Sequence, residues 1–158
     1  MMRAFFISTV VLSLIYVIAA VVIADSVSDA RSEALWNSYS TYDDSSYDSY
    51  GSYDYSYEDY YAEAESGTRM GGIVSVFYML ISAAVFVLAL MKIKTKTMKV
   101  ISIIGLSLSG LFLLWGMLPV ASPSGVSFDE IGAAFILAAV ALLGLHIVGM
   151  IHAFKTST

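Results

Sequence analysis

The 158-residue sequence contains no cysteine, and charged residues make up only 13% of it. Without cysteine, the chain has no disulfide framework, no thiolate metal site and no cysteine nucleophile. Soluble domains carry about 25% charged residues, whereas 58% of this chain is hydrophobic and its mean hydropathy is +0.77. The composition therefore excludes an ordinary water-soluble domain.

Four apolar stretches, at residues 4–24, 70–91, 100–120 and 131–151, contain no Asp, Glu, Lys or Arg. A hydrocarbon core about 30 Å thick needs about 20 helical residues, and backbone in lipid must satisfy its own hydrogen bonds. We therefore predict an all-α integral membrane protein. Its single domain is a four-transmembrane-helix bundle with spans at about 4–24, 70–91, 100–120 and 130–152.

The first stretch has a second interpretation as a secretory signal peptide, because Arg3 precedes it and the residues up to Ala24 resemble a cleavage site. The apolar region of a signal peptide is about 7–15 residues long. The longer stretch here favours a spanning anchor.

Charge predicts the orientation of the bundle. If successive helices cross the membrane in opposite directions, six basic residues and no acidic residue lie at one end: Arg3, Lys92, Lys94, Lys96, Lys99 and Lys155. The other end carries Arg31 and Arg69 against all 13 acidic residues. The positive-inside rule then predicts cytoplasmic termini, a cytoplasmic lysine loop at 92–99, and extracytoplasmic loops at 25–69 and 121–129.

The predicted outer loop at 25–69 has a low-complexity centre of Tyr, Asp and Ser that holds nine of the eleven tyrosines. Few aliphatic residues are available for a core, which favours a solvated segment. The alternation at Tyr53, Tyr55 and Tyr57 also suits a short strand, and residues 57–65 suit a helical turn before the second span. An acidic, aromatic surface suits contact with a basic partner. The candidate partner-binding residues are Tyr47, Tyr50, Tyr53, Tyr55, Tyr57, Asp48, Asp54 and Asp59.

Small residues recur on one face of each predicted helix, as association in lipid requires. The candidate helix-packing residues are Gly72, Ser75, Ser102, Gly105, Ser109, Ala134, Ala138 and Ala141. Ser127 and Glu130 match a capping box at the start of the fourth helix. We therefore interpret Asp129 and Glu130 as structural residues.

Two histidines, His146 and His152, are the candidates for chemistry inside a span. They are six residues apart and point about 120° from each other, so they cannot share a metal or a haem. We expect His146 to have a polar role in the membrane through a hydrogen bond to a neighbouring helix. No hydrolase, metalloprotease or phosphate-loop motif is present, so the sequence predicts no enzyme, no cofactor and no metal.

The layout of four spans with a long first outer loop is similar to that of claudins and tetraspanins, but the cysteines that mark that loop are missing and no family is assigned. The sequence predicts a non-catalytic accessory or interaction subunit of a larger membrane assembly, with the acidic tyrosine-rich loop as its contact surface. Its partners would be the lipid bilayer and other membrane subunits or further copies of itself, and not nucleic acid. The alternative is a small oligomeric cation channel or transporter in which Asp129 and Glu130 line an acidic outer vestibule.

Overall fold

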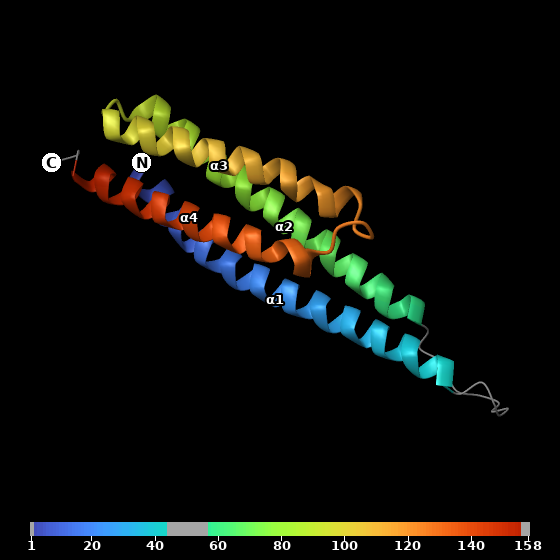
Figure 1. Ribbon diagram of the computed structural model, residues 1–158. Coiled ribbons are helices and arrows are strands. Elements are labelled where there is room, and N and C mark those ends of the chain that lie inside the picture. Colours follow the sequence, from blue (N-terminus) through green and yellow to red (C-terminus); the bar gives the residue numbers. More distant parts are fainter. Residues whose placement is uncertain (1, 44–56, 156–158) are drawn as a thin grey trace.

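The computed structural model describes residues 2–43 and 57–155, with side chains placed for residues 3–36 and 59–155. Its four helices are α1 (Met2–Asp43), α2 (Tyr57–Lys92), α3 (Lys96–Ala121) and α4 (Phe128–Lys155). They run alternately up and down, so that both termini lie at one end (Figure 1). Each helix is long and apolar enough to cross a membrane. The prediction of an all-helical fold with four long apolar helices is confirmed in the described residues, which contain no strand. Four such helices indicate a multi-pass membrane protein.

Each helix buries side chains at alternating steps of three and four residues. The buried positions of α4 include Phe128, Gly132, Phe135, Ala139, Leu142, His146, Gly149 and Ala153. Those of α1 include Phe6, Thr9, Ser13, Tyr16, Ala20, Val27, Ala30 and Ala34. This period of 3.5 residues is that of a left-handed coiled coil, in which side chains interdigitate along a narrow seam.

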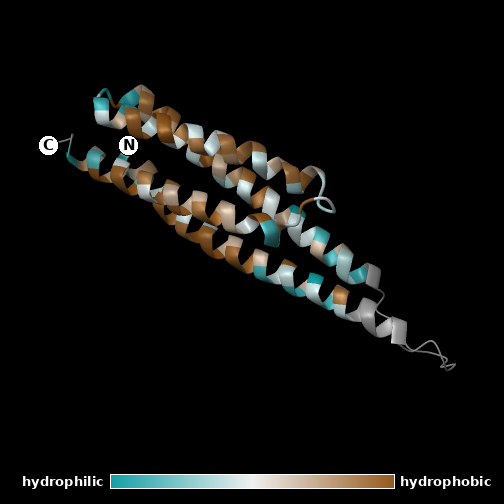
Figure 2. Ribbon diagram, viewed as in Figure 1, coloured by the Kyte–Doolittle hydropathy of each residue, from teal (hydrophilic) through white to brown (hydrophobic). Residues whose placement is uncertain are grey.

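Aromatic rings fit against glycines where the helices pack together. A side chain at Gly149 would place its Cβ 2.6 Å from the Phe6 ring, and one at Gly105 would overlap the Phe86 ring. These contacts fix the axial position of α1 relative to α4 and that of α2 relative to α3. The apolar residues consequently form one central band with polar residues toward the ends (Figure 2).

The first two helices extend well beyond the predicted spans. Residues 25–43 continue α1, and α2 begins at Tyr57, so the predicted outer loop at 25–69 is helical wherever it is described. Its centre, residues 44–56, lies outside the described residues. In Figure 1 both helices project past the connection between α3 and α4.

The extension is helical because the coiled-coil seam continues into it. Val27, Ala30 and Ala34 on α1 are buried, as are Ala64 and Thr68 on α2. Large aliphatic residues are scarce here, but Val27 and the buried alanines suffice for a two-helix seam. We call residues 25–36 with residues 59–69 the outer stalk, and the end of the bundle that carries it, opposite the two termini, the outer end (Figure 1). The 12 residues of α1 give the stalk a length of about 18 Å.

The contact of the Phe86 ring with Gly105 predicts that alanine substitution affects stability very differently at two glycines of α3. Replacing Gly105 by alanine forces the Phe86 ring to move and should destabilise the bundle by about 1–3 kcal/mol. A Cβ at Gly110 would meet no atom within 4 Å, so Gly110→Ala should be neutral or mildly stabilising. Unfolding of the two purified variants in SDS measures both effects. Equal losses would contradict the contact.

Candidate functional site

A chain of hydrogen-bonded polar side chains crosses the bundle core and takes one residue from each helix. Ser109 of α3 donates to Ser82 of α2 at 3.2 Å, and the Ser82 hydroxyl lies 3.2 Å from Nε2 of His146 on α4. On its other side, Nδ1 of His146 lies 3.4 Å from the hydroxyl of Ser13 on α1. We call these four residues, with Tyr78, the core network.

The hydrogen bonds favour one arrangement of protons on His146. Ser13 donates to the backbone carbonyl of Thr9 at 2.7 Å, so its oxygen accepts from Nδ1–H of His146 and from the hydroxyl of Tyr78, which lies 2.9 Å away. With the hydrogen on Nδ1, Nε2 is an acceptor. The Ser82 hydroxyl accepts from Ser109 and donates its own hydrogen to Nε2. A neutral imidazole satisfies the whole network, with both ring nitrogens in use.

Aromatic rings surround the polar groups of the core network. Phe86 stacks on His146 with ring centroids 4.7 Å apart, and Phe6 lies 6.5 Å away on a tilted plane. Tyr16 stacks on Tyr78 at 4.2 Å, and its hydroxyl lies 2.7 Å from that of Ser75. Sequence reasoning missed Tyr78; its spacing from Ser75 and Ser82 on the seam of α2 was the available signal.

The predicted packing residues divide into buried and exposed groups. The buried ones are Gly72, Ser75, Ser102, Gly105, Ser109 and Ala138, and Ala134 is half-buried. Ala141 is exposed on the outside of the bundle, so it does not pack against the other helices of this chain. The seam passes through Ala139 and Leu142 instead, because the helix follows the 3.5-residue period of its neighbours.

Most of the predicted partner-binding residues lie outside the part of the chain that the structure describes. These are Tyr47, Tyr50, Tyr53, Tyr55, Asp48 and Asp54. Tyr57 is the first residue of α2, and Asp59 is exposed in its first turn.

At the outer end, charged residues join the first turn of α4 to α1 at the base of the stalk. Arg31 of α1 lies 3.1 Å from the carboxylate of Asp129 and 3.0 Å from that of Glu130. Ser127 donates to the carboxylate of Asp129. The predicted capping box pairs Ser127 with Glu130 instead, but here the carboxylates of Asp129 and Glu130 both face Arg31. We call Arg31, Asp129, Glu130 and Ser127 the clasp.

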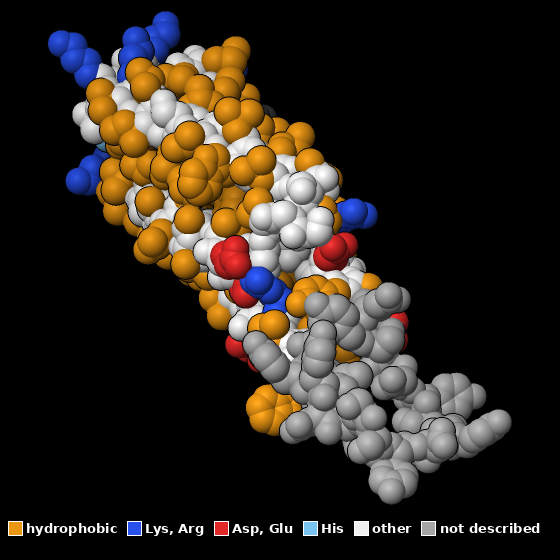
Figure 3. Space-filling model, turned by 45° about the vertical axis from the view of Figure 1, so that its right-hand side comes forward, with side chains coloured by type: hydrophobic (Ala, Val, Ile, Leu, Met, Phe, Trp, Pro, Cys, Tyr) orange, Lys and Arg blue, Asp and Glu red, His pale blue; other side chains and the backbone are white. Residues whose placement is uncertain are grey.

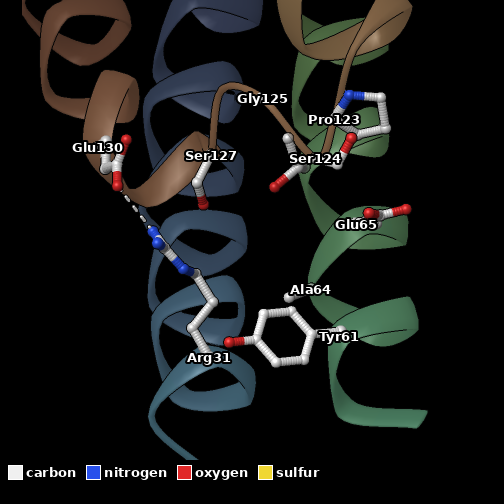
Figure 4. A pocket seen from close by; sticks show the side chains of 10 residues that line it. Arg31, Tyr61, Ala64, Glu65, Pro123, Ser124, Gly125, Ser127 and Glu130 are labelled. Carbon is white, nitrogen blue, oxygen red and sulfur yellow. Dashed lines mark hydrogen bonds and ion pairs between the residues drawn. The ribbon is translucent and has the colours of Figure 1, made fainter. Parts of the chain in front are cut away.

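Behind the clasp, α4 is anchored on α2 by its first residue. The backbone N–H of Phe128 donates to the hydroxyl of Thr68 at 3.3 Å, and a Cβ at Gly71 would lie 2.6 Å from the Phe128 ring. A pocket of about 310 Å³ lies beside these contacts. In Figure 4, Arg31 points toward Glu130, while Tyr61 and Ser124 face the pocket from α2 and from the connection.

The electrostatics of the clasp follow from its hydrogen bonds. Partial burial alone would raise the pKa of Asp129, but hydrogen bonds from Ser127 and Arg31 outweigh it and lower that pKa below its usual value. Asp129 therefore stays ionised in mild acid.

The opposite end of the bundle is closed by contacts between the termini. Arg3 donates to the backbone carbonyls of Ala153 and Phe154 at 3.4 and 3.2 Å, which caps the end of α4. The hydroxyl of Thr95 lies 2.8 Å from Nε2 of His152. Lys and Arg side chains gather at this end in Figure 3, beyond a belt of hydrophobic residues.

The described residues contain no group of three or more His, Asp or Glu side chains placed to hold a metal ion. The chain matches no protein-family model, and comparisons with curated proteins and with solved structures find no significant similarity. Its function is therefore argued from its own residues.

Two serines on the helix seams provide a test of the core network. Ser13→Ala removes a group that bonds Thr9, Tyr78 and His146 and should cost about 1–2 kcal/mol. Ser102 is equally buried, but its hydroxyl has no hydrogen-bond partner, so Ser102→Ala should be neutral or stabilising. Unfolding of both variants in SDS measures the difference, and equal destabilisation would show that the network adds nothing.

The clasp predicts a pH dependence at the outer end. Because the folded-state pKa of Asp129 is lowered, its contribution is complete above the unfolded-state pKa and is lost as the pH falls through the folded-state pKa, below about pH 4. Hydrogen exchange of residues 122–130, corrected for intrinsic rates, should therefore speed up from pH 5 to pH 3. Arg31→Gln should speed exchange at both pH values and flatten the dependence; an unchanged dependence in this variant would contradict the role of the clasp.

Proposed function

We propose that this protein is a non-catalytic interaction subunit of a larger membrane assembly. In this proposal the bundle anchors it in the bilayer, and the stalk holds the tyrosine- and aspartate-rich segment away from the membrane to contact a partner. The outer stalk is the observation that carries the proposal, because α1 and α2 both lead to that segment and both continue past the end of the bundle.

The stalk is well suited to hold a contact surface in a fixed position. Its seam buries side chains from both helices, and the clasp ties its base to the start of α4. A segment held at a rigid end loses less conformational entropy on binding than one in a long flexible loop. This supports recognition of a partner over a spacer role.

The interior of the bundle weighs against the channel alternative. Large buried side chains fill it, among them Phe6, Phe86, Leu142 and His146. The two acids assigned to a channel mouth, Asp129 and Glu130, are paired with Arg31. A structural bundle uses its side chains in this way, whereas an ion path through one subunit needs a hydrated interior.

Serine substitution of Tyr47, Tyr50, Tyr53 and Tyr55 tests the proposal. Aromatic side chains contribute much of the energy at interfaces, so association should weaken about tenfold or more, while the midpoint of SDS unfolding stays unchanged. The measurement is native mass spectrometry of the protein extracted from its own membrane, which gives the occupancy of the co-purifying subunit.

Phenylalanine at the same four positions is the matched control, because it keeps the rings and removes only the hydroxyls. Unchanged occupancy in the serine variant would refute a role for the segment. A lone chain or homo-oligomer in every preparation, together with cation flux in liposomes, would favour the channel instead.

A further inference from the structure

The two sides of the outer stalk differ. The clasp and the α3–α4 connection lie on one side, against Tyr61 and Glu65. On the other side, two adjoining hollows of about 350 and 520 Å³ follow the seam between α1 and α2 and share Glu33. Among the described residues, no other element lines these hollows. We call this surface the stalk groove; its principal residues are Asp25, Asp29, Glu33 and Trp36 of α1, and Tyr60 and Glu63 of α2.

A large aromatic residue lies at the outer end of the stalk groove. Trp36 is 76% exposed, and it lines the outer hollow together with Tyr60. It is twelve residues beyond Ala24, which is about 18 Å along the helix, so the hydrocarbon of the bilayer does not cover it. Tryptophan in a hollow, exposed to water, is typical of an anchor point for a protein partner.

The charge of the groove indicates the chemistry of that partner. Asp25, Asp29 and Glu33 follow each other at four-residue spacing on one face of α1, and Glu63 joins them from α2. None of the described residues that line the two hollows is basic. Like charges at this spacing destabilise a free helix, and a row of Lys or Arg on a partner would relieve the repulsion.

The same charge excludes a second copy of this chain as the occupant. A symmetric contact through the groove would bring the same carboxylates together, at a cost in repulsion. A cationic side chain can instead pair with the carboxylates and lie over the face of Trp36.

We propose that the stalk groove docks a Lys- and Arg-rich helical segment of a partner protein, running along the stalk outside the membrane. This inference rests on the proposed function and names the surface and the charge of the partner. The groove consists of described residues and is separate from the tyrosines tested above.

Trp36 provides a direct reporter of binding. The chain has two tryptophans, so Trp115→Phe leaves Trp36 as the only one. The probe is a synthetic helical peptide with lysine at every fourth position, titrated into the full-length protein in nanodiscs of zwitterionic lipid. We expect a saturable change in Trp36 fluorescence that weakens as salt rises, and no change with the same peptide carrying glutamate in place of lysine.

Two glutamates on α2 form a matched pair of variants. Glu63→Gln removes a charge from the groove and should weaken binding several-fold; adding Asp29→Asn should bring the loss to about tenfold. Glu65→Gln makes the same change two residues away on the clasp side and should leave the affinity within about twofold. Equal losses for Glu63→Gln and Glu65→Gln, or no response of Trp36 to the peptide, would overturn the proposal.

Native mass spectrometry separates this proposal from the proposed function. If the Asp29→Asn, Glu63→Gln variant keeps its co-purifying subunit at full occupancy, the groove is refuted and the interaction role stands. If that variant loses the subunit while the tyrosine-to-serine variant keeps it, the groove is supported and the tyrosine segment is not. A homodimer that depends on Trp36 would refute the basic partner.

Discussion

The bundle depends on aromatic rings that fit against glycines. Lipid provides no hydrophobic force between helices, so association rests on close packing and hydrogen bonds. Phe6 against Gly149 joins α1 to α4, and Phe86 against Gly105 joins α2 to α3. The same two rings flank His146, so the contacts that set the helix register also enclose the core network.

The helix register also determines which polar groups of the core form hydrogen bonds. A hydroxyl or an imidazole without a hydrogen-bond partner costs free energy in hydrocarbon, because no water replaces the missing bond. Ser13 and Ser82 satisfy the two nitrogens of His146, and Ser109 donates to Ser82. Buried Ser102 lies on the same seam without a partner, so the seam buries serines generally and only those near His146 join the network.

The outer stalk gives the protein an asymmetric shape with two distinct sides. The clasp joins one side to α4 through Arg31, while the other side carries the acidic groove. A coiled-coil seam that leaves the membrane without interruption transmits the rigidity of the bundle to the stalk. Both proposed contacts, with the tyrosine segment and with the groove, use that rigidity.

The sequence by itself determined the number of spans and the segregation of charge between their ends, because bilayer thickness acts on each apolar stretch separately. It also indicated a polar role for His146. The packing partners of His146, the outward position of Ala141 and the pairing of Arg31 with Asp129 required the tertiary structure. Each depends on the relative axial position of helices that are distant in the sequence. Helicity in residues 25–36 was missed for the same reason: the buried Val27 packs beside Gly67 of α2, and no local signal in the sequence predicts that contact.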